Sequence, residues 1–251
     1  MNKTVVITGA SSGIGKALAL EFAKRGYNLG LAARRLDKLK ALQAEIDQLA
    51  QASGNSARVE VCELDVDQTH LVGTTLLGLF NNLGQVDTVV VNAGVNKITA
   101  VGKGQLNDEL ALIQTNLLGA VATVNAAVEY FKARKKGHVV GISSLASLTP
   151  IPKQAAYCAT KAGFSMYLDA AAVELRKHNI RFTKILPGFV KTDIVENMDQ
   201  YPFIVSAEQA AREIVDHIEK GRSVGVVPGF PWKFVKPVLS NLPAAVWRYM
   251  K

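Results

Sequence analysis

A tyrosine and a lysine four residues apart, Tyr157 and Lys161, have the clearest capacity for chemistry in this sequence. They lie in the stretch QAAYCATKAGFSMYLDAAAVEL, whose pattern predicts a helix, so both side chains lie on one helix face. A phenol titrates near pH ~10, too high to exchange protons freely at neutral pH. An ammonium about 4 Å away would favour the phenolate and make Tyr157 a usable acid or base. Alone, the pair equally fits the surface of an amphipathic helix.

Two further polar residues stand where they could act with this pair. Ser144 lies thirteen residues before Tyr157, at the end of the apolar run HVVGIS, where its hydroxyl can bond a substrate carbonyl oxygen and the tyrosine. Its neighbour Ser143 is the alternative. Asn116 lies inside the helical stretch IQTNLLG, an unfavourable place for a side chain that competes with backbone hydrogen bonds. A purely structural Asn116 also remains open.

A glycine-rich loop near the start of the chain predicts a phosphate site. TGASSGIG, residues 8–15, separates an apolar run from a helical pattern. Gly9 permits a tight turn, Gly13 lets a phosphate approach the backbone, and Gly15 lets the helix pack closely, with its N-terminal amides facing a pyrophosphate. A glycine-rich turn without a ligand is the alternative.

The elements that must position these residues alternate regularly. Amphipathic helical patterns separate the apolar runs, which predict strands at residues 4–8, 28–33, 58–64, 87–91, 137–142 and 181–186 and a weaker one at 223–227. Such alternation predicts an α/β fold, a single-domain Rossmann-type doubly wound parallel sheet spanning residues 1–251. Ligands bind such sheets beyond the carboxyl ends of the strands, where TGASSGIG, AARR, LDV, VNAG, ISS and PGFVKT lie here.

Several ordered motifs together resemble the short-chain dehydrogenase/reductase family. The spacing G-x-x-x-G-x-G, VNAG at 91–94, YCATK at 157–161 and PGFVKT at 187–192 match its elements, and the resemblance runs from Thr4 to about Thr192. It implies Asn116, Ser144, Tyr157 and Lys161 as the catalytic group. The family's Ser-to-Tyr interval selects Ser144, and its matching Asn fixes a water that connects the lysine to solvent. It further implies a cofactor site formed by Gly9, Ser11, Ser12, Gly13, Ile14, Gly15, Arg34, Arg35, Asp65, Val66, Asn92, Ala93, Gly94, Tyr157, Lys161, Pro187, Gly188, Val190 and Thr192.

The end of the second predicted strand, LAARRLDK, bears on the choice of cofactor. Ala33 stands where an acidic residue would meet an unphosphorylated ribose, and Arg34 and Arg35 follow it. Arginine's planar fork of donors suits phosphate, so NADP(H) is preferred and NAD(H) remains open. Against NADP(H), Ser12 stands where many NADP-dependent relatives carry a second basic residue. Asp65 resembles the family's adenine-contacting acid, although it could equally cap the helix that follows.

Composition bounds the partners and the location. The chain has a net charge of +8, but its densest basic cluster, KARKKGH, most simply complements a helix C-terminus, so no nucleic-acid partner is expected. No signal sequence, metal site or membrane-spanning run is expected, which predicts a cytoplasmic protein. The four histidines are interpreted as surface or capping residues, and the family resemblance implies a homodimer or homotetramer.

The sequence therefore predicts an NADP(H)-dependent oxidoreductase that transfers a hydride between nicotinamide and a carbonyl or alcohol, with a lipophilic small molecule as substrate. A redox-silent dinucleotide-binding regulator and a membrane-surface protein are the alternatives. We expect a substrate-segment insertion around residues 190–222. In the tail, residues 226–251, aromatic and basic residues such as Trp232, Lys233, Trp247 and Arg248 alternate. This tail suits a peripheral membrane contact, a pocket rim, or a segment folded onto the core or another subunit.

Overall fold

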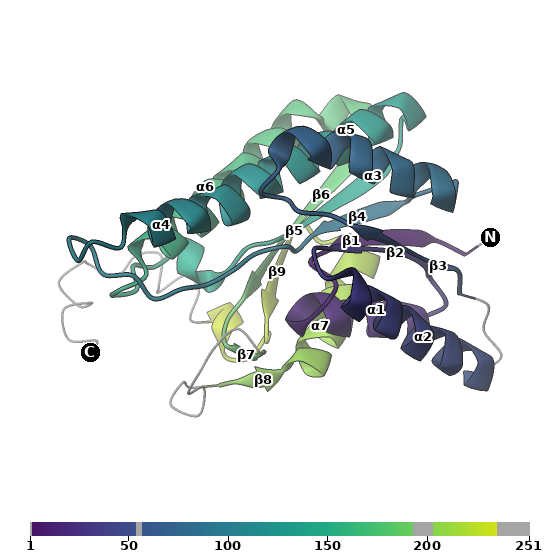
Figure 1. Cartoon of the computed structure of the whole chain (residues 1–251), viewed down its shortest axis with the longest axis horizontal. Helices are drawn as coiled ribbons and strands as arrows, with labels where there is room; N and C mark the ends of the chain where they lie inside the picture. The colour runs from purple at the N-terminus through teal and green to yellow at the C-terminus, as the bar shows by residue number, and fades with distance from the viewer. Residues whose placement is uncertain (1, 54–56, 193–202, 235–251) are drawn as a thin grey trace.

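Seven parallel strands form the main sheet of this protein, in the order β3-β2-β1-β4-β5-β6-β9 (Figure 1). The computed structural model describes residues 2–53, 57–192 and 203–234. The strands of the main sheet are β1 (Thr4–Thr8), β2 (Asn28–Ala33), β3 (Val59–Glu63), β4 (Thr88–Val91), β5 (Gly137–Ile142), β6 (Ile180–Pro187) and β9 (Val224–Val227). Runs such as TVVIT in β1 are buried along their whole length, as expected for β-branched residues in a sheet covered on both faces.

Helices cover both faces of this sheet (Figure 1). One face carries α1 (Gly13–Lys24), α2 (Leu36–Ser53) and α7 (Ala207–Glu219), and the other carries α3 (Thr69–Leu83), α5 (Ala120–Arg134) and α6 (Ala155–Glu174). α4 (Leu106–Ile113) continues through the π-helical turn η1 (Gln114–Gly119) into α5, and two 3-10 turns, η2 (Leu145–Ser147) and η3 (Arg176–His178), flank α6. Each helical layer has its own apolar core, and the predicted doubly wound fold is confirmed.

The strand order reverses between β1 and β4, and this position determines where a ligand can bind. From β1 the chain proceeds outward to β2 and β3, and then returns to β4 on the other side of β1. The loops that leave β1 and β4 therefore diverge to opposite faces and leave a crevice at their carboxyl ends. The glycine loop and VNAG are those two loops.

The segment expected to be a substrate insertion, residues 190–222, includes α7, one of the helices that pack against the main sheet. Helix α7 buries Ile214, Val215 and Ile218 in the same core as α1 and α2. Between β6 and α7, the short strands β7 (Val190–Lys191) and β8 (Val205–Ser206) pair with one another. Residues 193–202 lie outside the described residues. Only the part of the segment that precedes Ala207 therefore remains a proposal as a substrate element.

The interpretation of His138 as a surface or capping residue is wrong. His138 lies in β5, is 2% exposed, and its Nε2 lies 2.8 Å from Thr183 Oγ1. Because the Thr183 hydroxyl gives its single proton to Arg222 O at 2.6 Å, the histidine Nε2 is the donor in the bond to Thr183. Burial, together with the charge of Arg181, lowers the pKa of His138 to about 4. A continuous apolar strand around a single histidine does not reveal its hydrogen-bond partner on the neighbouring strand.

Acid is expected to destabilise the fold through His138. The unfolded chain binds the proton near pH 6.5 and the folded chain only near pH 4, so stability is lost as the pH falls between these values. The loss due to this residue is about 3 kcal/mol. Urea unfolding at pH 7 and pH 4 measures it, and His138→Leu should show a correspondingly smaller difference between the two pH values. An equal pH dependence in both proteins would contradict the assignment.

Candidate functional site

The phenol of Tyr157 and the hydroxyl of Ser144 meet beyond the carboxyl end of β5. Tyr157 lies in the first turn of α6, and Ser144 immediately precedes η2. The Ser144 hydroxyl lies beside the Tyr157 phenol, where it favours the charged form of that phenol, and its Oγ accepts the Ala146 N–H at 3.1 Å. The bond from Ala146 fixes the orientation of the Ser144 hydroxyl.

Ser143, the alternative to Ser144, is buried, and its hydroxyl makes hydrogen bonds within the protein. It is 3% exposed, donates to Lys161 O at 3.0 Å, and shares a hydrogen bond of 2.7 Å with Ser165 Oγ. Successive residues of an extended chain point to opposite sides, which is why these neighbours have different environments. Ser143 ties α6 to the end of β5, while Ser144 faces Tyr157.

Lys161 lies on the same face of α6 as Tyr157, but it does not lower the pKa of the phenol. Its Nζ lies 5.7 Å from the centre of the Tyr157 ring and donates to Ile142 O at 3.1 Å. Burial raises the pKa of Tyr157, and the neighbouring Ser144 hydroxyl opposes that rise only in part. Burial also lowers the pKa of Lys161 to about 8. The lowered phenol pKa predicted from the four-residue spacing is therefore wrong, and Tyr157 is protonated at neutral pH.

Asn116 lies in the π-helical turn η1, where it clamps the loop that follows β4. Its Oδ1 accepts the Val95 N–H at 2.8 Å and its Nδ2 donates to Val95 O at 2.8 Å. A Cβ on Gly94 would lie 3.1 Å from Asn116 Oδ1 and 3.6 Å from Lys161 Nζ. The structure thus brings Asn116 and Lys161 together around Gly94. Single-turn π segments often occur at functional positions, because they break the regular helical ladder.

The glycine loop is closely packed against the start of the loop after β4. Gly9 has a φ of +68°, which favours glycine, and a Cβ there would lie 2.7 Å from Ala93 Cα. A Cβ on Gly15 would lie 2.3 Å from Gly9 O and 2.6 Å from Asn92 Nδ2. Only glycine fits at Gly15, so α1 begins directly against the turn, as predicted. Ile14 lies in its first turn.

Thr8 and Asn92 join the two loops at the crevice, and the sequence analysis did not single out Thr8. Asn92 Nδ2 donates to Thr8 O at 3.0 Å and to Gly9 O at 3.2 Å. Thr8 Oγ1 in turn accepts the Asn92 N–H at 3.1 Å. The amide of Asn92 therefore holds the crevice together. The one available signal for Thr8 was a hydroxyl residue at the end of an apolar strand.

Arg35 rather than Arg34 contacts the glycine loop. Its Nη2 lies 2.9 Å from Ser11 Oγ and 2.8 Å from Ser12 Oγ, although the residues are more than twenty positions apart. Ser12 precedes α1 but its side chain does not cap the helix. An exposed guanidinium, two hydroxyls and the first turn of α1 thus meet at one place. This is a donor set suited to phosphate.

Asp65 and Val66 lie at the end of β3, next to η1. Asp65 Oδ1 accepts the Asp67 N–H at 3.2 Å and so stabilises a local turn. α3 begins only at Thr69, and Gln68 occupies its cap position, so the capping alternative for Asp65 is wrong. Val66 is 6% exposed, and a Cβ on Gly119 would lie 2.8 Å from its carbonyl oxygen.

β6 ends at Pro187, and the chain that follows it carries Gly188 and Thr192 back over the crevice. The Gly188 N–H donates to Val227 O at 2.7 Å, and a Cβ on Gly13 would lie 3.4 Å from the Thr192 side chain. Thr192 therefore faces the glycine loop. Val190, in β7, is buried in the core beneath α1.

The described part of the tail is folded onto this turn. Val226 and Val227 belong to β9, and Trp232 packs over Gly188. Of the roles predicted for the tail, these residues best fit a segment folded onto the core. Phe230 and Phe234 are exposed. Residues 235–251, including Trp247 and Arg248, lie outside the described residues.

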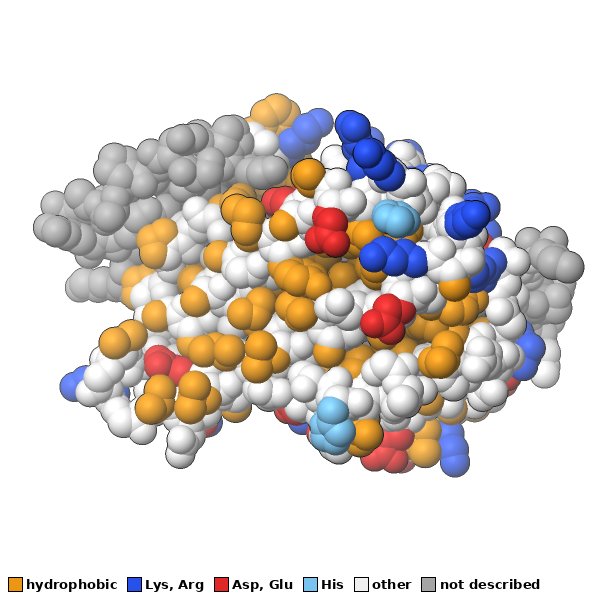
Figure 2. Space-filling model, turned by 90° about the horizontal axis from the view of Figure 1, so that it is seen from above, with side chains coloured by type: hydrophobic (Ala, Val, Ile, Leu, Met, Phe, Trp, Pro, Cys, Tyr) orange, Lys and Arg blue, Asp and Glu red, His pale blue; other side chains and the backbone are white. Residues whose placement is uncertain are grey.

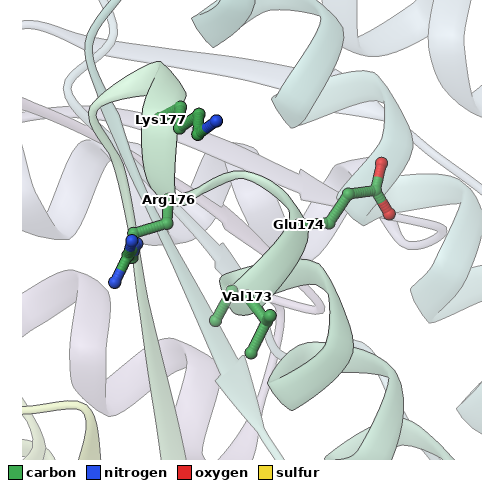
Figure 3. Close-up of a pocket in the computed structure, with 5 residues that line it drawn as sticks. Val173, Glu174, Arg176 and Lys177 are labelled. Carbon is green, nitrogen blue, oxygen red and sulfur yellow. The ribbon is translucent and has the colours of Figure 1, made fainter.

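A surface hollow of about 540 Å³ lies far from these residues along α6 (Figure 3). It is lined by Ala172, Val173, Glu174, Arg176 and Lys177, at the opposite end of the helix from Tyr157. None of the predicted site residues lines it, so it does not bear on their chemistry.

The described residues contain no group of three or more His, Cys, Asp or Glu side chains that could hold a metal ion. One continuous helix, Leu106–Arg134, is long and apolar enough to cross a membrane, but 56% of its most apolar window is buried in the fold. Such burial is typical of a core helix, and this helix packs on the sheet as η1 and α5.

Comparison with known proteins agrees with this geometry. The sequence profile of the family described as short chain dehydrogenase matches residues 3–202. An uncharacterized oxidoreductase of Myxococcus xanthus is 37% identical over 94% of this chain and 90% of its own. A 3-oxoacyl-[acyl-carrier-protein] reductase of Bos taurus is 32% identical over 80% of this chain and 81% of its own.

Among solved structures, an alcohol dehydrogenase of the archaeon Thermococcus sibiricus, complexed with 5-hydroxy-NADP, superposes with a TM-score of 0.80. It is 27% identical, and the match covers 90% of this chain and 95% of that one. Both the sequence match and the sheet order lead to one conclusion. The chain belongs to the short-chain dehydrogenase family and is an oxidoreductase of that family.

Proposed function

We propose that the protein uses NADP(H) to reduce a carbonyl compound or to oxidise the corresponding alcohol. The observation that carries this proposal is the meeting of Ser144 and Tyr157 beside the crevice between β1 and β4. The bovine relative is named as a reductase of a 3-oxoacyl group, which supports a carbonyl substrate. The archaeal structure contains an NADP derivative, which supports the choice of cofactor.

The residues present fit a phosphorylated dinucleotide. Gly9 and Gly15 let the glycine loop and the start of α1 pack closely against the loop after β4, and the start of α1 supplies N–H groups for a pyrophosphate. The guanidinium of Arg35, held beside Ser11 and Ser12, would bind the 2′-phosphate, and Arg34 adds positive charge. We further assign the adenine end to Asp65 and Val66 and the nicotinamide end to Asn92, Ala93, Gly94, Pro187, Gly188, Val190 and Thr192. Bound NADPH would supply the hydride for reduction.

The chain's own residues would manage the carbonyl oxygen and its proton. Ser144 and Tyr157 both donate hydrogen bonds to that oxygen, and Tyr157, which is protonated at neutral pH, gives it a proton during reduction. Lys161, whose Nζ lies 5.7 Å from the centre of the Tyr157 ring and whose pKa is lowered to about 8, would then return a proton to the phenolate that forms. Asn116 acts as a positioning residue, because both ends of its amide hold Val95 beside Gly94 and Lys161.

A screen of cofactor oxidation tests this proposal. We expect the purified protein to oxidise NADPH in the presence of some members of a panel of chemically diverse ketones and aldehydes, and to use NADH less well because of Arg35. Apolar carbonyl compounds should be the better substrates, since Phe189 and Trp232 lie beside the turn after β6. NADPH binding without turnover of any panel member would favour a redox-silent regulator instead.

Assembly and location are part of the proposal. Figure 2 shows hydrophobic side chains gathered along the face that α3, α5 and α6 form; exposed Leu118 lies in η1, and exposed Met166 and Val173 lie in α6. An apolar face of this kind supports a homodimer or homotetramer. We place the protein in the cytoplasm. Exposed Phe230 and Phe234 favour a peripheral membrane contact as a second candidate for the tail.

A further inference from the structure

The side chain of Trp232 contacts both segments that flank the Ser144–Tyr157 pair. Its indole packs against the apolar cluster of Leu145, Leu186 and Val226, and Leu145 directly follows Ser144. The indole also lies over Gly188, where a Cβ would come within 2.8 Å of Nε1. Trp232 therefore lies between the loop of the catalytic serine and the turn after β6. It also lies beyond residues 3–202, which the family profile matches.

Two phenylalanines extend this contact into an aromatic wall. The Phe189 ring meets Trp232 edge-on, with centroids 5.8 Å apart, and the Phe203 ring does so at 6.1 Å. These three residues come from three segments, after β6, before β8 and after β9. A carbonyl oxygen held by Ser144 and Tyr157 would place the substrate's substituents next to this apolar surface.

The indole N–H of Trp232 is a buried donor that lacks an acceptor. Among the described residues, Nε1 is one of the buried side-chain atoms without a hydrogen-bond partner. An indole N–H can only donate, and leaving a buried donor unpaired is unfavourable. Because Nε1 lies over Gly188, in the turn after β6, an oxygen of a substrate bound beside that turn would supply the acceptor.

We propose, on the basis of the carbonyl chemistry above, that Trp232 determines substrate specificity. Its ring contacts an apolar substituent of the substrate, and its N–H donates to a second oxygen of that substrate. The class of substrate is a ketone or aldehyde that carries an aromatic or branched apolar group and, close to the reacting carbonyl, an ester, amide or thioester oxygen.

The indole resonance of Trp232 provides a direct test. The chain has two tryptophans, so a ¹⁵N-labelled sample gives two indole N–H signals, and Trp247→Phe identifies that of Trp232. The probes are ethyl benzoylformate, an aryl 2-oxo ester, and acetophenone, which lacks the second oxygen. Each is added to the protein with NADP⁺, so that no reduction occurs. We expect the Trp232 signal to shift downfield with the oxo ester and to shift less with acetophenone.

Kinetics of matched variants provide the second arm. Trp232→Phe keeps an aromatic ring without the donor, and we expect the preference for the oxo ester over acetophenone in kcat/KM to fall roughly 10-fold. Trp232→Leu should lower kcat/KM for both substrates. The control is Phe230→Leu, since Phe230 is 76% exposed and its ring pairs with Phe234 at 6.4 Å; it should leave the preference unchanged.

The outcomes separate this inference from the proposed function. A Trp232 signal that neither probe moves overturns the inference, even if the enzyme reduces both ketones. An unchanged preference in a folded Trp232→Phe protein also overturns it. A Trp232 signal that moves only with the oxo ester supports the inference. If in addition no carbonyl compound is reduced, the proposed reaction is wrong, but the role of Trp232 in binding remains. If the Trp232→Phe or Trp232→Leu protein does not fold, the response of the Trp232 indole signal to the two probes tests the inference without those variants.

Discussion

Tyr157→Phe is expected to lower kcat for the best carbonyl substrate of the panel by at least ~10²-fold, the usual effect of losing a general acid. The substitution removes the hydroxyl that lies beside Ser144 and keeps the ring. NADPH affinity and the melting temperature should change little, because the glycine loop and the sheet do not depend on that hydroxyl. Steady-state rates, fluorescence titration with NADPH and thermal unfolding measure the three quantities.

Tyr167→Phe is the matched control for this experiment. Tyr167 lies on the same helix, and its hydroxyl accepts a hydrogen bond from Asn125 Nδ2 at 2.8 Å, away from Ser144. Its loss should leave kcat within about 2-fold, as for a surface substitution. A Tyr157→Phe protein with nearly normal kcat would remove Tyr157 from the reaction and leave only its packing role.

Arg35→Glu is expected to weaken NADPH binding by about 10²-fold and NADH binding much less, since it replaces a charge-assisted phosphate contact by repulsion. The structure places the Arg35 guanidinium on Ser11 and Ser12, next to the start of α1. Titration of both cofactors by fluorescence measures the two dissociation constants. Raising the salt concentration should reduce the difference between Arg35→Glu and the parent protein, because the contact is exposed.

Arg34→Glu makes the same change of charge one residue away. Because the Arg35 guanidinium, and not that of Arg34, bonds the serines, we expect Arg34→Glu to weaken NADPH binding less than Arg35→Glu. If the parent protein bound both cofactors equally well, or if Arg34→Glu had the larger effect on NADPH, the assignment of the 2′-phosphate to Arg35 would be wrong.

The sequence was sufficient for the order of the elements because each carries its own local pattern. The runs at β1, β2 and β5 have the same limits in the structure as in the prediction, and even the weaker run became β9, one residue shorter. Apolar parallel strands separated by amphipathic helices have few other ways to bury their surface. The need for glycine at position 15 could also be predicted from the sequence, since close packing of the helix is a local requirement of the βα turn.

What the sequence determined by itself is therefore the doubly wound sheet and the close packing of the glycine loop at the start of α1, because periodicity and spacing along one chain encode them. Only the tertiary structure decided which of two neighbours makes each contact: Ser144 lies beside Tyr157 while Ser143 is buried, and Arg35 contacts the serines. It likewise buried His138 against Thr183 and placed Trp232 over Gly188. These facts depend on contacts between residues distant in sequence and on the burial that follows. Burial also lowered the pKa of Lys161 and raised that of Tyr157, whereas the spacing of the two residues alone predicted a lowered phenol pKa.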